Sequence, residues 1–468
     1  MADNPILILQ MQRLGDLVLT FPLLGWLQRL HPNNPLWIVG EEYFFKHLMT
    51  LSPNATFFPY TAAAALKKRR FHAVINLSHR EEAIALAGEA RGNLLLGPYR
   101  TASGKVHVNG NWQLYRMSLV HNNRHNQYHW SDLHGLDLVP PQHMAQTRWP
   151  PPRTVATTAS AHIGLFLGAS EEDKKPDAAF WTELARRLLL AGHRPVLLGG
   201  EMEKPVGGQV AASLRAHSLD LTGRFSLSEL AAFIHSLDLF VTPDTGPMHV
   251  AVWSGTPTLN LSLGPVNAWE TGPFSPGHLV LRAKIGCIGC WRCVQRSVLC
   301  KDHLSPSRTA SLIHTLMTRG RDALSGYALP GQELLLSRRD SCGLYDLEAL
   351  LPRHPGRHAA GKFWHDFFGN LFGIVPDDAV SGAWRNLGTI SPKIQEKFIR
   401  SLARLNKNLA HCLKTDSPGD LESPQFWLSF PPLLRPLTSY MQLMLHNERF
   451  RRPAFADALA MAEKLACL

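Results

Sequence analysis

The sequence predicts an α/β fold in which two Rossmann-like, doubly wound domains face a cleft and a mainly helical C-terminal appendage follows them. Three observations carry this prediction. Short apolar runs alternate with helix-length segments over residues 5–139, a proline-rich segment interrupts the pattern at 149–153, and the alternation restarts at residue 163. Such alternation is typical of βαβ units and a parallel sheet. The length of 468 residues is enough for about three domains.

The first domain is expected over residues 1–152. Its first strand, Ile6–Met11, is an unbroken apolar run, and Leu17–Leu30 has the length of a helix. Three further apolar runs are expected to form parallel strands: residues 36–39, 73–77 and 94–96. The segment Trp149–Arg153 reads WPPPR, and we expect a linker there because proline lacks the amide donor that a helix or central strand needs.

The second domain is expected over residues 153–328. Ile163–Leu167 begins it as a buried strand, and Ala178–Ala191 follows as a helix. Ser226 and Glu229 have the spacing of a capping box at the start of another helix. Further strands are expected at residues 195–198, 239–242 and 258–261. This half therefore repeats the doubly wound pattern of the first.

The appendage, residues 329–468, is expected to be mainly helical. β-Branched runs are nearly absent from it, and residues 441–445 and 455–465 have helical character. The clearest amphipathic pattern is a series of apolar residues at helical spacing: Ile394, Phe398, Leu402, Leu405, Leu409 and Leu413.

The composition limits which binding partners and which cellular compartment we expect for the protein. Lys and Arg total 48 against 37 Asp and Glu, so the formal charge of +11 favours a partner that carries phosphate: nucleic acid, an anionic membrane surface, or a nucleotide and phosphorylated substrate. Seven cysteines are too few for a disulfide scaffold and suit a reducing compartment. The N-terminal apolar run is too short for a signal peptide, and no run of about 18 apolar residues occurs. We expect a cytoplasmic protein, with peripheral contact at the inner membrane as an open alternative.

Asp16 follows the first expected strand, in the stretch Gln10–Asp16. Ligands of doubly wound sheets bind at the carboxyl ends of strands, so the Asp16 carboxylate is placed to face the cleft. Aspartate is also a favoured helix N-cap, and it can serve a ligand only if the backbone does not occupy the carboxylate. Both interpretations stay open from the residues alone.

The segment after the strand at 163–167 has the composition of an anion-binding loop. Its small residues allow backbone amides to approach an anion, while Ser170 supplies a hydroxyl donor and Lys174 a positive charge. The acidic residues 171–173 lie between them, so a solvated charged loop is the alternative.

The segment Asp244–His249 follows the strand at 239–242 and opens a helix. The free amides and positive dipole end near Thr245 and Gly246 can hold a diphosphate, with His249 one turn further on. The alternative is a capped helix start with a core histidine. Asp-Thr-Gly also occurs in aspartic proteases, but those need two paired copies in a β fold, and only one copy exists here.

Together, these stretches resemble glycosyltransferase family 9, the heptosyltransferases that build the bacterial lipopolysaccharide core. The pieces that carry the resemblance are, in order, Arg13-x-Gly15-Asp16 with Pro22, Lys174 ahead of Trp181, and Asp244-Thr245-Gly246-x-x-His249 followed by Gly264-Pro265. Two positions depart from the family pattern. Lys175-Pro176 stands where Trp-Pro is usual, which leaves Lys174 and Lys175 as candidates for the lysine, and Pro247 replaces a larger apolar residue.

The resemblance implies the two-domain GT-B fold and an inverting transfer of a heptose or related sugar from a nucleotide donor, usually ADP-heptose, to a lipopolysaccharide-type glycan. It implies that Asp16 is the general base that takes the proton of the acceptor hydroxyl. It also implies donor contacts by Ser170, Lys174, Glu201, Asp244, Thr245, Gly246 and His249. No catalytic metal or other catalytic cofactor is expected. The alternatives are a protein heptosyltransferase of the autotransporter type and a catalytically degenerate transferase that serves as a scaffold.

Four of the seven cysteines have ligand-like spacing: Cys287, Cys290, Cys293 and Cys300. Four thiolates hold zinc or iron tetrahedrally, so a structural metal is predicted, with an iron–sulfur cluster as a lesser option and reduced thiols as the alternative. The resemblance adds that one family branch, which glycosylates autotransporters, carries iron at this point. No recognition helix accompanies the cluster, so nucleic acid is not expected as a partner.

Two other clusters have ordinary explanations. The segment His121–His134 has three histidines at helical spacing, but its Asn and Arg residues indicate an exposed polar stretch rather than a metal site. The basic segment Lys67–Arg70 either contacts lipid phosphates or is a solvated loop.

Overall fold

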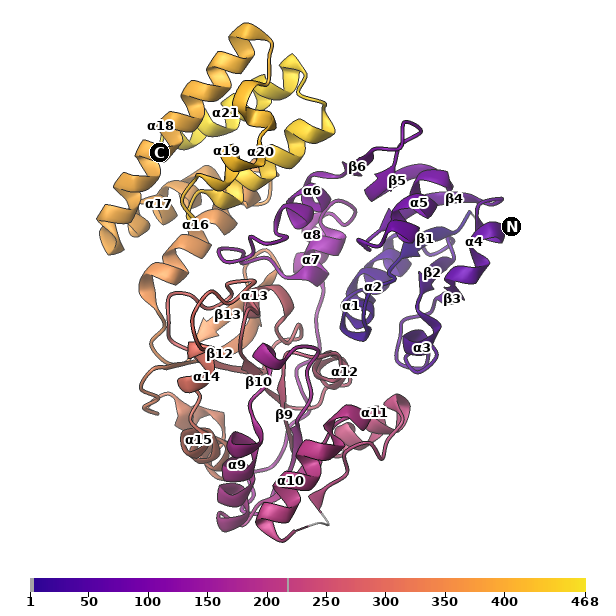
Figure 1. Ribbon diagram of the computed structural model, residues 1–468. Helices are drawn as coiled ribbons and strands as arrows, with labels where there is room; N and C mark the ends of the chain where they lie inside the picture. The colour runs from indigo at the N-terminus through magenta and orange to yellow at the C-terminus, as the bar shows by residue number, and fades with distance from the viewer. Residues whose placement is uncertain (1–3, 217–218) are drawn as a thin grey trace.

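A computed structural model describes residues 4–216 and 219–468 of the chain (Figure 1). Two sheets with flanking helices account for the first three quarters of the sequence, and helices form the rest. In Figure 1 the first sheet is indigo to purple, the second runs from magenta to orange, and the C-terminal helices are orange to yellow. Within the described residues, no helix is both long and apolar enough to cross a membrane.

The first sheet has six strands in the order β3-β2-β1-β4-β5-β6. Its strands are β1 (Ile6–Leu9), β2 (Leu36–Gly40), β3 (Thr56–Pro59), β4 (Arg70–Asn76), β5 (Arg91–Arg100) and β6 (Val106–Asn109). The first five strands are parallel and β6 pairs antiparallel with β5. The order 3-2-1-4-5 is that of a Rossmann fold, as the sequence predicted.

Eight helices accompany the first sheet. They are α1 (Leu14–Val18), α2 (Phe21–Leu30), α3 (Glu42–Phe45), α4 (Ala63–Leu66), α5 (Glu81–Glu89), α6 (Asn111–Ser118), α7 (Trp130–Gly135) and α8 (Pro141–Gln146). The single helix expected over 17–30 is therefore wrong, because α1 and α2 are separate helices. Pro22 is the reason, since it has no amide to donate to the carbonyl of Val18 and so interrupts a continuous helix.

The second sheet has seven strands in the order β13-β12-β11-β10-β9-β7-β8. Its strands are β7 (His162–Phe166), β8 (Arg194–Leu198), β9 (Leu239–Pro243), β10 (Thr258–Ser262), β11 (Leu279–Ala283), β12 (Gln332–Arg339) and β13 (Tyr345–Ala349). Strands β7 to β11 are parallel in the order 2-1-3-4-5, a second common doubly wound order. Strands β12 and β13 extend the sheet antiparallel and come from the region expected to be mainly helical.

Seven helices accompany the second sheet. They are α9 (Ala178–Leu190), α10 (Lys204–Leu214), α11 (Leu227–His235), α12 (Gly246–Trp253), α13 (Ala268–Thr271), α14 (Leu299–Asp302) and α15 (Pro306–Arg319). The predicted capping box starts α11: Glu229 N–H donates to Ser226 Oγ at 3.4 Å and Ser226 N–H to Glu229 Oε2 at 2.8 Å. The predicted linker, Trp149–Arg153, has no regular secondary structure.

The C-terminal region is a bundle of six helices. They are α16 (Pro355–Leu371), α17 (Asp377–Ile390), α18 (Pro392–Thr415), α19 (Pro424–Leu428), α20 (Arg435–Asn447) and α21 (Arg452–Ala466). The bundle reaches the first sheet through Asn447, whose side chain exchanges two hydrogen bonds with the backbone of Val108 on β6, at 3.1 and 2.8 Å. Two Rossmann-like domains and a helical C-terminal region are thus present, and the predicted fold class is confirmed.

Candidate active site

A cavity of about 480 Å³ is lined by residues that follow strands of both sheets. The N-terminal half contributes Gln12, Arg13, Asp16, Asn123 and Trp130. The second half contributes Glu171, Lys174, Asp244, Pro265, Val266, Asn267, Glu270, Thr271 and Trp291. Three residues singled out from the sequence, Asp16, Lys174 and Asp244, therefore line the same cavity although they lie far apart in the chain.

Asp16 is the third residue of α1 and is half-buried. Asp16 is not the N-cap that the sequence left open, because Arg13 holds that position; instead Asp16 Oδ2 accepts the backbone N–H of Arg13 at 3.1 Å. Burial raises the pKa of Asp16, and the charge of Asp244 adds to that effect, whereas Arg13 and the fully buried Arg116 oppose it. The carboxylate is a stronger base than an exposed aspartate as a result.

Asp244 follows β9 and faces the same cavity. Thr271 Oγ1 donates to Asp244 Oδ2 at 2.9 Å, and His249 Nε2 lies 3.7 Å from Oδ1. Burial raises the pKa of Asp244, and the nearby positive charge of Lys174 opposes this. Burial lowers the pKa of His249 to about 3, so its imidazole is neutral at physiological pH and offers an N–H rather than a charge.

Helices α1 and α12 approach each other closely at two glycines. A Cβ on Gly15 would lie 2.9 Å from His249 Cδ2, and a Cβ on Gly246 would lie 2.7 Å from Leu14 Cδ2. The contact between the two halves of the molecule therefore requires both residues to lack side chains. Leu14 covers the first turn of α12, and the predicted residues Thr245, Gly246 and His249 stand beside the cavity rather than in its lining.

Lys174 lies on a short turn after β7. Its Nζ is 3.4 Å from Glu171 Oε1, and Arg13 Nη1 is 4.0 Å from the same oxygen, so Glu171 links cations from both halves. Gly264, in the loop after β10, packs directly on this turn. It has a φ of +67°, and a Cβ there would overlap the carbonyl oxygen of Asp173. Gly264 thus positions the turn that carries Lys174.

Ser170 and Glu201 are exposed and do not line the cavity. A neighbouring acid that the sequence analysis did not select, Glu203, lies between the loops after β7 and β8. Its Oε2 accepts the N–H of Gly200 at 2.9 Å, and its Oε1 would be 2.8 Å from a Cβ on Gly168. The single signal in the sequence was its distance of three residues from Gly200, the spacing of a capping acid.

Glu270 and Asn123 also line the cavity and were missed from the sequence. Glu270, on α13, is 3 % exposed, and Asn123 is 4 % exposed. Asn123 Nδ2 donates to Glu270 Oε2, whereas Glu270 Oε1 and Asn123 Oδ1 accept no hydrogen bond from the described residues. Burial raises the pKa of Glu270 to about 7, and the charge of Asp244 contributes to this rise.

The segment His121–His134 is not the exposed polar stretch that the sequence predicted. Its residues before α7 are not helical, and residues 122–129 are buried or half-buried rather than exposed. Asn267 holds the segment from the other half of the molecule, because its Nδ2 donates to the carbonyls of Asn123 and Asn126 at 2.8 Å each. The polar side chains that indicated exposure instead bond mostly to other parts of the chain: Asn122 to Ser439, Asn123 to Glu270 and Arg124 to the carbonyl of Gly286.

The four clustered cysteines line one small apolar cavity of about 30 Å³. Cys300 Sγ accepts the N–H of Gly264 at 3.1 Å. Burial raises the pKa of the Cys290 and Cys300 thiols. Across residues 4–216 and 219–468, no three Cys, His, Asp or Glu side chains converge closely enough to hold an ion. The four thiols thus share one cavity but do not converge on one point, and the metal stays a prediction from their spacing.

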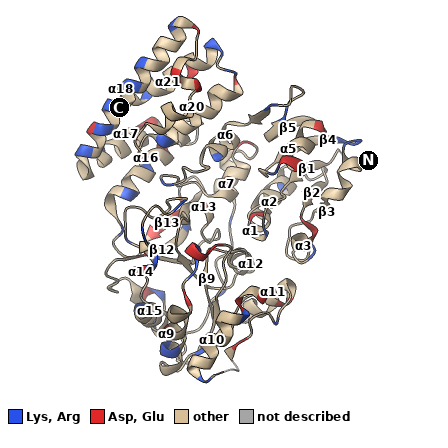
Figure 2. Cartoon of the chain, in the orientation of Figure 1, with Lys and Arg blue, Asp and Glu red and all other residues tan. Residues whose placement is uncertain are grey.

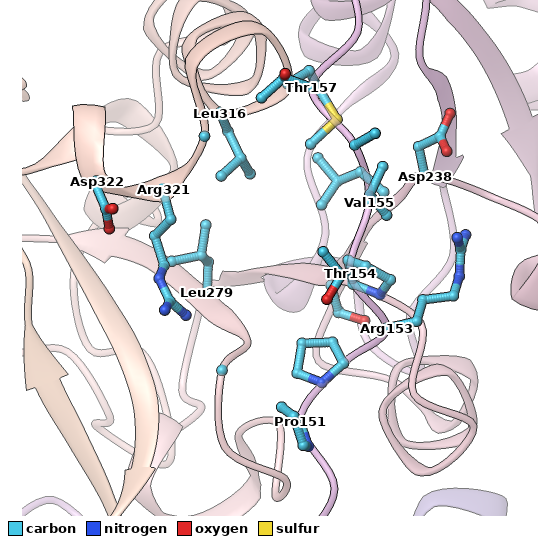
Figure 3. A pocket seen from close by; sticks show the side chains of 18 residues that line it. Pro151, Arg153, Thr154, Val155, Thr157, Asp238, Leu279, Leu316, Arg321 and Asp322 are labelled. Atoms are coloured by element: carbon cyan, nitrogen blue, oxygen red, sulfur yellow. The ribbon is translucent and has the colours of Figure 1, made fainter.

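A second cavity, of about 440 Å³, lies at the amino ends of the parallel strands of the second sheet (Figure 3). Its lining residues Asp238, Pro257 and Gly277 precede the strands β9, β10 and β11. Ligands of doubly wound sheets bind at the carboxyl ends of strands, so the cavity with Asp16 and Asp244 is the better candidate site.

Comparison with known proteins finds relatives of this chain among bacterial heptosyltransferases. The sequence profile of glycosyltransferase family 9 (heptosyltransferase) matches residues 95–298. Lipooligosaccharide heptosyltransferase 2 of Haemophilus influenzae is 29 % identical over 106 residues, which are 22 % of this chain and 30 % of that protein. The lipopolysaccharide core heptosyltransferase OpsX of the same organism is 22 % identical over 314 residues, 58 % of this chain and 83 % of that protein. The alignment to the first relative thus spans less than a third of its length.

Two solved structures superpose on part of this chain at low identity. The Escherichia coli ADP-heptose lipopolysaccharide heptosyltransferase II superposes with a TM-score of 0.49 and 18 % identity, over 67 % of this chain and 98 % of that one. The dodecameric iron-containing heptosyltransferase TibC superposes with a TM-score of 0.44 and 16 % identity, over 68 % and 77 % of the two chains. The profile match and the sequence relatives agree with the predicted resemblance of this chain to glycosyltransferase family 9.

Proposed function

We propose that the chain transfers a heptose or related sugar from an ADP-sugar to a lipopolysaccharide-type glycan, with inversion, at the cytoplasmic face of the membrane. One observation carries the proposal: Asp16 from one half of the molecule lines the same cavity as Lys174 and Asp244 from the other. An inverting displacement needs a base on the acceptor side and a cation on the leaving-group side of one enclosed space.

In this proposal, Asp16 takes the proton of the acceptor hydroxyl. The hydroxyl oxygen attacks the anomeric carbon as the bond from that carbon to the diphosphate oxygen breaks, and the nucleoside diphosphate leaves. The raised pKa of Asp16 suits a base that must accept a proton near neutral pH.

Lys174 would pair with the departing diphosphate in place of Glu171, which now lies 3.4 Å away. The backbone amides of Thr245 and Gly246, at the start of α12, would add donors, and His249 would contribute a neutral N–H. We also assign Ser170 and Glu201 to donor binding, because the resemblance to glycosyltransferase family 9 implies these contacts. Because Leu14 covers the first turn of α12, donor binding would need α1 to move slightly outward.

The buried polar lining of the cavity suits a sugar rather than an apolar substrate. The unpartnered oxygens of Asn123 and Glu270 would accept hydrogen bonds from sugar hydroxyl groups, and Asp244 would do the same from the second half.

The test is transfer by the purified chain with ADP-heptose as donor. The variant Asp16→Asn should bind ADP as the wild type does but transfer about 10²- to 10⁴-fold more slowly, because the base is lost while the hydrogen bond from Arg13 N–H is kept. Asp378→Asn, an exposed position on α17, is the matched control and should transfer normally. Undiminished turnover by Asp16→Asn would remove Asp16 as the base, and failure of any nucleotide sugar to bind would refute the donor class.

A further inference from the structure

Helix α18 carries a regular stripe of basic side chains. Six Lys and Arg residues and one His recur at alternating spacings of four and three: Lys393, Lys397, Arg400, Arg404, Lys407, His411 and Lys414. A mean spacing of 3.5 residues drifts only about 20° per seven residues on an α-helix, so the whole series stays on one face along the length of the helix.

The opposite face of α18 is the one that packs into the bundle. Its buried residues also alternate at four and three: Phe398, Leu402, Leu405, Leu409 and Cys412. At about 100° per residue, this buried series is centred roughly 150° around the helix from the basic one. The basic stripe therefore points away from the protein, and all six of its Lys and Arg residues are exposed.

The charge of the stripe is almost uncompensated. Glu396 is the one acidic residue of α18, and its Oε1 lies 3.5 Å from Arg400 Nη2. Six cations against one anion leave a net charge of +5 on this helix, nearly half of the +11 of the chain. Figure 2 shows blue Lys and Arg residues along α18, at the outer edge of the molecule.

The shape of this surface is flat and long. Twenty-four residues at about 1.5 Å each give a helix of about 36 Å. Ile394 and Ile399, which are 48 % and 53 % exposed, add apolar side chains beside the stripe. The exposed residues of α18 include no Phe, Tyr or Trp side chain on which a nucleic-acid base could stack, since Phe398 is buried.

We propose that the basic stripe of α18 binds the anionic headgroup surface of a phospholipid bilayer. A lipid surface is flat, extended and negatively charged, and basic amphipathic helices with flanking apolar residues bind such surfaces. Charge complementarity assigns this partner, and the assignment stands independently of the proposed sugar transfer. Docking through α18 would hold the cavity at a fixed height above the membrane.

The test is co-sedimentation of the full chain with vesicles of phosphatidylglycerol and phosphatidylcholine, and with vesicles of phosphatidylcholine alone. The wild type should bind the anionic vesicles only, and added salt should release it. A variant with four stripe residues neutralised, Lys393→Gln, Lys397→Gln, Arg400→Gln and Lys407→Gln, should bind several-hundredfold more weakly, at about fivefold per charge. Arg404 is left in place because its Nη2 donates to Ser429 Oγ at 2.7 Å.

The matched control removes four exposed charges that lie outside α18 and form no ion pair with the described residues: Arg91→Gln, Lys105→Gln, Arg224→Gln and Arg319→Gln. This variant should bind anionic vesicles as the wild type does, and thermal unfolding should show that both variants are folded. If both variants lost vesicle binding equally, the binding would depend on net charge alone, and the proposal would be overturned. Unchanged binding by the α18 variant would also overturn it, as would binding of a DNA duplex tighter than binding of the anionic vesicles.

Discussion

The buried carboxyl group of Glu270 should make the stability of the protein depend on pH in a defined way. Burial raises its pKa from the usual 4.5 to about 7. At about 1.4 kcal/mol for each tenfold change in proton affinity, the ionised carboxylate costs the folded state roughly 3 kcal/mol. Because the folded state binds the proton more tightly than the unfolded state, this cost is absent below pH 4.5. It grows as the pH rises to 7.

The variant Glu270→Gln isolates this contribution. An amide has the shape of the protonated acid, cannot ionise, and can donate to the unpartnered Oδ1 of Asn123. Relative to the wild type, the variant should therefore gain about 2 to 3 kcal/mol in free energy of unfolding between pH 5 and pH 8. Urea unfolding of both proteins at the two pH values measures the gain.

The comparison has an internal control. The pKa values of buried histidines such as His125 and His129 lie well below 6.5, so these residues destabilise the folded protein as the pH falls. This effect is the same in both proteins. Glu82→Gln, at an exposed position on α5, should show no gain at either pH. The free energy of unfolding changes between pH 5 and pH 8 in each protein. If this change were the same in the wild type and in Glu270→Gln, Glu270 would ionise normally and the burial argument would be wrong.

Two further predictions concern the contact between α1 and α12 and the cysteine loop. Gly15→Ala should lower the free energy of unfolding by about 1 to 3 kcal/mol, because its Cβ would lie 2.9 Å from His249 Cδ2. Gly25→Ala on α2, where no atom lies within 4 Å of the added Cβ, should be neutral or stabilising in the same thermal unfolding assay. The cysteine spacing predicts one structural zinc or iron per chain that Cys290→Ser removes and that Cys467→Ser, at an exposed cysteine, retains. Elemental analysis decides this, and equal metal content in wild type and Cys290→Ser would exclude Cys290 as a ligand.

Local pattern was enough to predict most of the doubly wound core. Unbroken apolar runs identified β1, β7 and β9, and one polar capping pair identified the start of α11, because these signals lie within a few residues of each other. Strands β12 and β13 escaped detection since Glu333, Arg338 and Arg339 break the apolar run of β12. What makes β12 a strand is its antiparallel pairing with β11, about fifty residues earlier in the chain.

The residues of the candidate site likewise fall into those that local sequence predicts and those that it does not. Asp16, Lys174 and Asp244 each follow an expected strand, so their position at the carboxyl edge of a sheet could be argued from sequence. Asn123 and Glu270 lie 147 residues apart, and neither has a distinctive neighbour. Their importance arises from burial against each other, which only the packing of the two halves creates.

The C-terminal bundle has a mechanical consequence. The chain passes between the two sheets once at the linker 149–153 and makes a second connection through the bundle, which continues from β13 and is fastened to β6 by Asn447. The same bundle packs broadly on the first half, since Tyr128 Oη donates to the carbonyl of His365 at 2.6 Å and the ring centroids of Tyr115 and Phe368 lie 4.5 Å apart. One group of helices therefore holds both halves that line the cavity. Its removal should leave the halves connected by the linker and by their direct contacts alone, and so should let the cavity open more widely.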